Sequence, residues 1–215
     1  MTHLKRLLAT LFVLIFVLTA PRVNAKTLLE IGYMPILPVS QLFVALENKW
    51  LSESDIDVKL VRFQNGPAMV QALLAGQLDV AHFGIGPAMV ARAKGADIKV
   101  VAASIKEQIS FIALGDLAPY FKSDPSKAFA KFRADKGRKA VVTTFPVGSV
   151  PQTVLQYWLL KKLGANPEDV KIIYQGSALV QQALATGAVD AAAILEPIVT
   201  KITQITRKNT IELIL

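Results

Sequence analysis

The sequence predicts an α/β protein of two lobes built on a similar plan, with mostly parallel sheets flanked by helices. Short apolar segments of strand type alternate along most of the chain with segments whose apolar residues recur at helical spacing. The stretch LLAGQLDVA at 73–81 returns as LATGAVDAA at 184–192, with its glycine and aspartate at the same places. With 215 residues, 53% of them hydrophobic, the chain can bury one sizeable core or two modest ones.

Positions 1–25 have the layout of a secretory signal. Lys5 and Arg6 precede an apolar run over 7–20, and the small-residue sequence VNA at 23–25 provides a cleavage site at its end. The run is shorter than the roughly 20 apolar residues that span a bilayer. We therefore expect an exported, soluble mature chain, with an uncleaved membrane anchor as the alternative.

The first half of the mature chain alternates strand and helix. The segment GPAMVQALLAG begins with Gly-Pro and ends on glycine, as helices commonly do. The two segments at 98–104 and 109–115 are both of strand type, with no room for a helix between them. The expected strands are 28–33, 56–63, 78–84, 98–104 and 109–115, and the expected helices are 38–51, 66–76 and 87–94.

The alternation then restarts in a second unit. Its final segment, TIELIL, is predicted to be one more strand that begins a return toward the first lobe. The expected helices are 127–134, 149–164, 177–187 and 196–205, and the expected strands are 139–145, 170–176, 188–195 and 210–215.

The repeated motif occupies the same helix-turn-strand place in each unit. Gly76 and Gly187 are expected to end a helix in a left-handed turn, which favours glycine. Asp79 and Asp190 follow at the entry to a strand, where each carboxylate is expected to accept hydrogen bonds from turn amides. A single copy of the motif would be explained by local turn formation and hydrogen bonding, but its recurrence in each half indicates two related lobes.

Charge and composition exclude several classes of protein. Removal of the three basic residues of the signal lowers the net charge from +8 to +5. The basic run over 116–139 has no interleaved aromatic residues of stacking type, so a solvated surface is favoured over a nucleic-acid site. The chain has no cysteine, which excludes disulfides, thiolate metal sites and cysteine nucleophiles.

The ordered segments resemble one known family. The pieces IGYMP, ALLAGQLDVAHFG, GADIKVVAAS, GSVPQTVLQYWLLKKLGANPEDVKIIYQG and LATGAVDAAAILEPIVTK are similar to periplasmic solute-binding proteins of bacterial ABC importers. The group is that for nitrate, taurine and alkanesulfonates, with thiamine-pyrimidine relatives. The resemblance implies a type II periplasmic-binding-protein fold, a monomer that closes on a small solute, and an inner-membrane ABC permease as partner.

The resemblance also implies a division of the chain. We expect a signal peptide at 1–25, lobe one at 26–114, lobe two at 115–207 and the start of the return strand at 208–215. Family members continue past this point to complete lobe one, so the last part of that lobe is expected to be missing here. Uncovered apolar surface on lobe one would then predict poor solubility or a partner that supplies the missing part.

Candidate ligand residues lie at the strand-to-helix junctions. Ligands of open α/β sheets bind outside the carboxyl ends of the strands, where helix N-termini offer free amides suited to anions. Each serine there has a plain helix cap as its alternative, and Glu196 could either bind an amine or accept amides at its own helix start. The candidates are Ser40, Gln64, Asn65, Gly66, Gly84, Gly86, Gly148, Ser149, Ser177 and Glu196.

Enzyme classes have less support. His82 is the one histidine outside the signal segment, and a hydrogen-bonded core histidine is the commoner case at the end of a strand. A synthase-like enzyme of the thiamine-pyrimidine group, or a binding protein for such a pyrimidine, is the alternative function. No phosphate loop, nucleophile elbow or zinc helix occurs, and we expect no catalytic residue, cofactor or metal.

Overall fold

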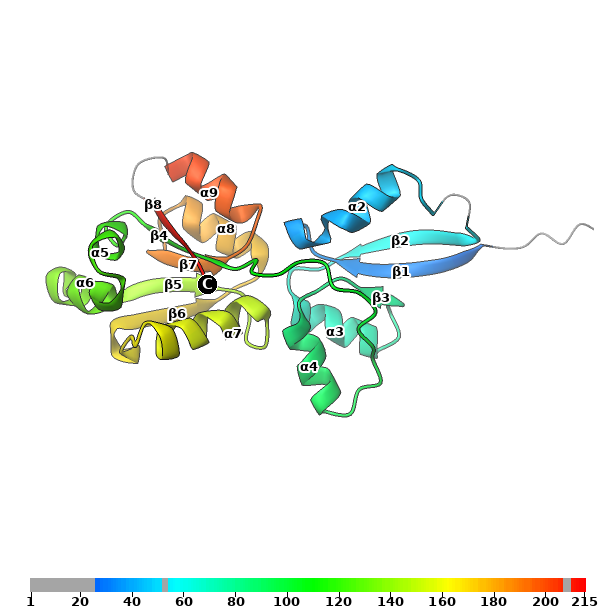
Figure 1. Ribbon diagram of the computed structural model, residues 1–215, viewed down its shortest axis with the longest axis horizontal. Helices are drawn as coiled ribbons and strands as arrows, with labels where there is room; N and C mark the ends of the chain where they lie inside the picture. The colour runs from blue at the N-terminus through cyan, green and yellow to red at the C-terminus, as the bar shows by residue number, and fades with distance from the viewer. Residues whose placement is uncertain (1–25, 52–53, 207–209) are drawn as a thin grey trace, which may run out of the picture.

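The chain forms two lobes, each with its own β-sheet, in a computed structural model that describes residues 26–51, 54–206 and 210–215. The lobes lie side by side along the long axis of the molecule, and the segment after α4 runs between them (Figure 1). The expected signal segment lies outside the described residues.

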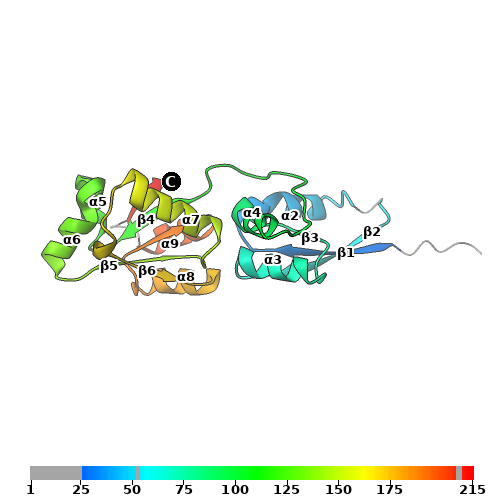
Figure 2. The same ribbon diagram turned by 90° about the horizontal axis from the view of Figure 1, so that it is seen from below.

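Lobe one has a three-stranded parallel sheet in the order β2-β1-β3. The helices α2 and α3 cover opposite faces of this sheet (Figure 2). The strands are β1 (Thr27–Tyr33), β2 (Ile56–Arg62) and β3 (Val80–Ala81); the helical segments are η1 (Leu37–Val39), α2 (Ser40–Glu47), α3 (Gly66–Leu74) and α4 (Ile85–Ala93).

Lobe two has a five-stranded sheet in the order β6-β5-β7-β4-β8. The strand β5 is parallel to β6 and β7, whereas β4 is antiparallel to both of its neighbours. The strands are β4 (Ser110–Leu114), β5 (Ala140–Thr144), β6 (Val170–Tyr174), β7 (Ala191–Ile194) and β8 (Thr210–Ile214).

The helices of lobe two cover both faces of its sheet, with α7 and α8 on opposite sides (Figure 2). The expected helix at 149–164 is divided, because its last turn is a π-helical segment rather than α-helix. The helical segments are α5 (Ala118–Ser123), η2 (Pro125–Lys127), α6 (Ala128–Lys136), α7 (Val150–Tyr157), η3 (Trp158–Lys162), η4 (Pro167–Asp169), α8 (Ser177–Ala185) and α9 (Ile198–Thr206).

The core of lobe two centres on Phe111, which is fully buried in β4. Its ring lies 4.7 Å from that of Trp158 and 5.1 Å from that of Phe121, centroid to centroid. On the neighbouring strand, β7 buries Ala191, Ala192, Ala193 and Ile194 completely. Small alanine side chains on β7 leave space for large aromatic residues nearby, which is how a close-packed interior fills its volume.

The repeat of the sequence is a repeat of the structure. The helices α3 and α8 begin at 66 and 177 and end at 74 and 185, so both ends keep the offset of the repeated motif. Gly76 and Gly187 have φ angles of 70° and 68°, which confirms the left-handed turn. The two lobes therefore share one plan at the level of the backbone.

The repeated aspartates bind strand amides rather than turn amides, which corrects the expectation. Asp79 Oδ2 accepts from the Glu30 N–H at 2.8 Å, and Asp190 Oδ2 accepts from the Val141 N–H at 2.8 Å. Glu30 and Val141 themselves occupy equivalent positions of the repeat. The backbone amides of the two aspartates donate in return to the carbonyls of Glu30 and Val141. Each aspartate thus fixes the register of its strand against the first parallel strand of its lobe.

Three expectations about strands and the lobe boundary were wrong. Residues 98–104 are irregular, and Val100 and Val101 are 64% and 87% exposed. A strand needs a paired neighbour for its amides and carbonyls, and the described sheet of lobe one ends at β3. In addition, β4 pairs with β7 and β8, so the change of lobe precedes residue 109 and does not follow residue 114. The final strand β8, expected as a return toward lobe one, pairs within lobe two.

Several basic residues of the run over 116–139 form ion pairs. Lys136 Nζ lies 2.8 Å from Asp116 Oδ2, and Lys139 Nζ lies 2.9 Å from Glu168 Oε2. The Lys136 ammonium lowers the pKa of the Asp116 carboxyl, and Lys139 lowers the pKa of Glu168 in the same way. These charges are exposed and already partnered, which agrees with a solvated surface. Among the described helices, none combines the length and apolar character needed to cross a membrane.

Candidate functional site

Loops at the carboxyl ends of both sheets meet across one cleft. In lobe one these loops follow β1, β2 and β3, and in lobe two they follow β5, β6 and β7. Hydrogen bonds and close contacts join the two sets directly. The junctions chosen from the sequence therefore face one another.

Gln64 and Ser177 come together across this cleft. The carbonyl oxygen of Gln64 accepts from the Ser177 N–H at 3.3 Å, and its side-chain Oε1 accepts from the Ala178 N–H at 3.4 Å. Both amides belong to the first turn of α8, which begins after Gly176. A residue of lobe one thus provides acceptors for a helix of lobe two.

A second contact joins the glycines after β3 to the start of α7. A Cβ built on Gly84 would overlap the Cγ2 methyl of Val150, and one built on Gly86 would lie 3.4 Å from the same methyl. The carbonyl oxygen of Gly148 would lie 3.6 Å from that Cβ of Gly86. The absence of side chains at Gly84 and Gly86 therefore permits the close approach of the lobes at this point.

A third contact involves Glu196, which follows β7. Its carbonyl oxygen accepts from the Leu37 N–H of lobe one at 3.0 Å. Its carboxylate accepts from the N–H of Thr200 at 3.0 Å and from the hydroxyl of Thr200 at 2.8 Å. Of the two roles open to Glu196, the geometry favours the acceptor at its own helix start over the amine ligand.

The remaining candidates act mainly in the local backbone. Ser149 Oγ accepts from the Gln152 N–H, and Asn65 Oδ1 accepts from the Ala68 N–H at 2.9 Å, so each caps the helix that follows. Ser40 does not take its alternative role as the cap of α2, because η1 already starts the helical run and Val39 is the cap residue. Gly66 is the first residue of α3 and is buried, with Pro87 beside it.

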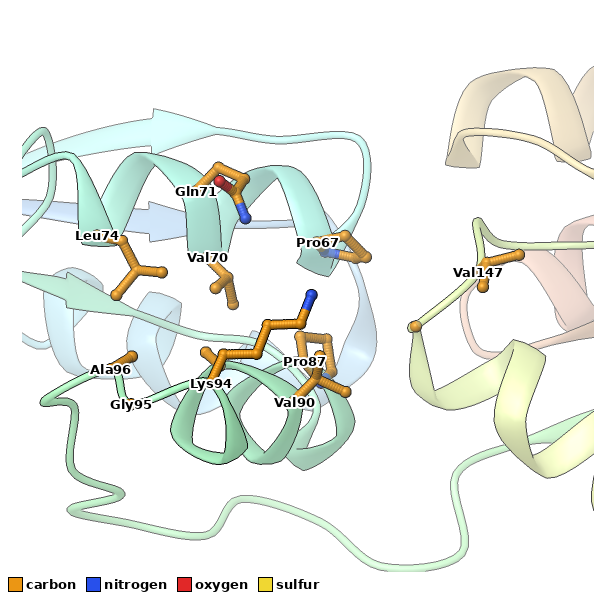
Figure 3. Close-up of a pocket in the computed structure, with 12 residues that line it drawn as sticks. Pro67, Val70, Gln71, Leu74, Pro87, Val90, Lys94, Gly95, Ala96 and Val147 are labelled. Carbon is orange, nitrogen blue, oxygen red and sulfur yellow. The ribbon is translucent and has the colours of Figure 1, made fainter.

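A hollow of about 440 Å³ adjoins the cleft between α3 and α4. This volume lies within the range of small-molecule sites. The Lys94 side chain reaches between the two helices toward Pro67, with Val147 of lobe two across the gap (Figure 3). The lining residues are Pro67, Val70, Gln71, Leu74, Pro87, Val90, Ala91, Lys94, Gly95, Ala96, Val147 and Gly148.

Sequence reasoning selected one of these lining residues, Gly148, and missed Lys94. Lys94 contributes the one formal charge of the lining, and the apolar side chains come from both helices. Gln71 lies within a helix and Lys94 at the end of one, so a search confined to strand-to-helix junctions passed over them. The sequence did show a lysine at the end of the predicted helix, in the segment ARAKG at 91–95.

His82 directly follows β3 and is half-buried. Burial lowers the pKa of its imidazole below the ordinary value of 6.5, because the charged form loses hydration. The lowered pKa favours the neutral imidazole at pH 7. In the part of the chain that the structure describes, no group of three or more histidine, cysteine, aspartate or glutamate residues could hold a metal ion.

A family model described as the NMT1-like family matches residues 23–206. The chain belongs to the NMT1-like family. Among curated relatives of this NMT1-like chain, a binding protein from Brucella abortus (strain 2308) is 29% identical over 156 residues. That match includes 73% of this chain and 44% of the relative, so the chain spans less than half of the relative's length.

Solved structures give the same fold. The ligand-binding component of an ABC-type import system from Staphylococcus aureus, solved with zinc bound, matches the NMT1-like chain with a TM-score of 0.68 at 22% identity. The match covers 87% of this chain and 60% of that one. The alkanesulfonate-binding protein from Xanthomonas axonopodis pv. citri, bound to MOPS, gives a TM-score of 0.65 at 25% identity, with 86% and 60% covered. The fold is therefore that of solute-binding proteins, and these neighbours are binding proteins rather than enzymes.

Proposed function

We propose that this chain is the substrate-binding component of an ABC transporter and captures a small anionic or zwitterionic solute in the periplasm for import. The observation that carries the proposal is the meeting of junction loops from both lobes across one cleft, at Gln64 with Ser177 and at Gly84 with Val150. Ligands of open α/β sheets bind at this edge. Two lobes that meet there can close around a small molecule.

An organic sulfonate with a short apolar chain is the solute class that we propose. The hollow beside the cleft pairs the Lys94 ammonium with apolar side chains such as Val70 and Val90. A sulfonate would place its anionic group at the cation and its carbon chain on the apolar wall. The name of the Xanthomonas relative, an alkanesulfonate-binding protein, supports this choice. The periplasmic location of this chain rests on the signal expected at 1–25, and its permease partner rests on the family.

A panel of candidate solutes tests the proposed function by thermal unfolding. We expect an alkanesulfonate such as MOPS to raise the melting temperature with increasing concentration, because a ligand that binds only the folded state stabilises it. Taurine, nitrate, bicarbonate and a thiamine pyrimidine complete the panel. A response to the pyrimidine alone would favour the pyrimidine-binding alternative.

Lys94→Gln locates the site within the hollow. We expect it to weaken sulfonate binding by about tenfold, since a charge-assisted hydrogen bond is replaced by a neutral one. Lys171→Gln is the control, because Lys171 is an exposed residue of β6 and its loss changes the net charge equally. Isothermal titration calorimetry measures both affinities. Equal affinities in the two variants would refute the placement of the sulfonate at Lys94.

A further inference from the structure

The helix α8 begins without a cap of its own. Its cap residue is Gly176, which has no side chain to accept a hydrogen bond. The corresponding helix of lobe one, α3, is capped by Asn65, whose Oδ1 accepts from the Ala68 N–H at 2.9 Å. Asn65 and Gly176 occupy equivalent positions of the repeat, each directly before its helix. The two lobes therefore differ at this position, although the helices match in length.

The missing acceptor comes from the other lobe. Gln64 accepts from the Ser177 and Ala178 amides through its carbonyl oxygen and Oε1. A Cβ on Gly176 would lie 3.4 Å from the Gln64 Cβ, so glycine leaves the space that Gln64 uses. The first amides of a helix have no partner within the helix and require an acceptor from elsewhere. The contact between Gln64 and α8 therefore exists only where the two lobes approach each other.

We infer that Gln64 is an interlobe positioning residue, which caps α8 across the cleft and thereby favours the closed arrangement before any solute arrives. In the open arrangement these amides would turn to water, so the net gain on closure is the modest gain of a protein hydrogen bond over one to solvent. The closed state is the one in which solute would contact both lobes. A larger population of the closed state would therefore raise the apparent affinity of the proposed site for its solute.

The chain supplies a matched control for Gln64. Gln175 is its counterpart at the equivalent position of lobe two, and its Oε1 accepts from the Thr143 hydroxyl of the same lobe at 3.0 Å. Gln64→Ala removes an interlobe acceptor, whereas Gln175→Ala removes one within a lobe. Gly176→Asn copies the cap of lobe one onto α8, which would make the Gln64 acceptors redundant and crowd the Gln64 side chain.

Interlobe distances measured without solute test this inference. Because the chain has no cysteine, Glu47→Cys on α2 and Lys201→Cys on α9 give two exposed sites for spin labels, one in each lobe. Pulsed electron-electron double resonance then reports the distribution of distances between the two spin labels. We expect Gln64→Ala and Gly176→Asn each to lower the closed-to-open ratio by about two- to tenfold, as one side-chain hydrogen bond implies. Gln175→Ala is expected to leave the distribution unchanged.

The outcomes separate this inference from the proposed function. A Gln64→Ala distribution that matches the unaltered chain would overturn the inference, as would an equal change in Gln175→Ala. Gly176→Asn keeps α8 capped, so opening in this variant cannot be attributed to loss of lobe two. The consequence for affinity rests on the proposed function, and an absence of solute binding would refute that function while the distances still decide the role of Gln64.

Discussion

The Asp190 carboxylate is the clearest place to test how the repeated motif stabilises the fold. It accepts from the Val141 N–H and also pairs with both terminal nitrogens of Arg138 at 2.7 Å. The Asp190 side chain is 13% exposed, while that of Arg138 is 50% exposed. Asp79, its counterpart in lobe one, is exposed and accepts from Glu30.

Asp190→Ala is expected to lower the free energy of unfolding of lobe two by about 1.5–4 kcal/mol, the sum of two contributions. A charge-assisted hydrogen bond from a partly buried amide contributes about 1.5–3 kcal/mol. The half-exposed ion pair with Arg138 adds at most about 1 kcal/mol. Asp190→Asn retains an acceptor for Val141 but removes the charge, so about half of that loss is expected. Asp79→Ala is expected to cost about 1 kcal/mol, because its hydrogen bond is exposed.

Urea unfolding followed by tryptophan fluorescence measures these differences. The chain has two tryptophans, Trp50 in lobe one and Trp158 in lobe two, so Trp50→Phe leaves a probe of lobe two alone. A reverse substitution, Trp158→Phe, gives the matching probe of lobe one for Asp79→Ala. If Asp190→Ala cost no more than Asp79→Ala, the reasoning from burial and the bidentate Arg138 contact would be refuted.

Two further predictions concern His82 and the glycine contact across the cleft. Because burial lowers the pKa of His82 in the folded chain, the unfolded chain binds the proton more readily, and stability should fall as the pH drops from about 6.5 toward the lowered pKa. His82→Gln should show a smaller loss between pH 7 and pH 5 in urea unfolding, and an unchanged loss would contradict this cause. Gly84→Ala should widen the interlobe distance and weaken solute binding several-fold, because its methyl would overlap Val150. Val150→Ala in the same chain removes the overlapping methyl but keeps a Cβ at 3.1 Å, so it should reverse most of both effects. A double variant no better than Gly84→Ala would exclude the steric explanation.

The sequence was sufficient for most of the order of elements and for the relation between the lobes. Period and glycine placement predicted most strands and helices, and the left-handed glycines at 76 and 187 are confirmed. These features depend on neighbours in the chain, which a sequence displays directly. The expected strand at 98–104 failed because pairing requires a partner distant in sequence, and its β-branched residues alone cannot show whether one is present.

The candidate site was predictable at the level of junctions but not of partners. That Gln64 accepts from α8 depends on the approach of two loops from different lobes, far apart in the chain, which no local pattern encodes. The short helix α5 was also missed, because APYFKS carries too few turns to display a period. Lys94 was missed for a different reason, since its proposed role depends on the hollow between two helices.

The unequal sheets have a consequence for how the molecule unfolds. In lobe one, β3 pairs with β1 over two residues, whereas in lobe two the buried strand β4 pairs on both edges. Among the described residues, each lobe uses its own continuous stretch of chain, so opening one does not require opening the other. Amide protons of β3 should therefore exchange with deuterated solvent long before those of β4, as expected for units of different local stability. The solute would then bind to a protein whose two halves resist unfolding to different degrees, and its stabilising effect would be greatest on the weaker half.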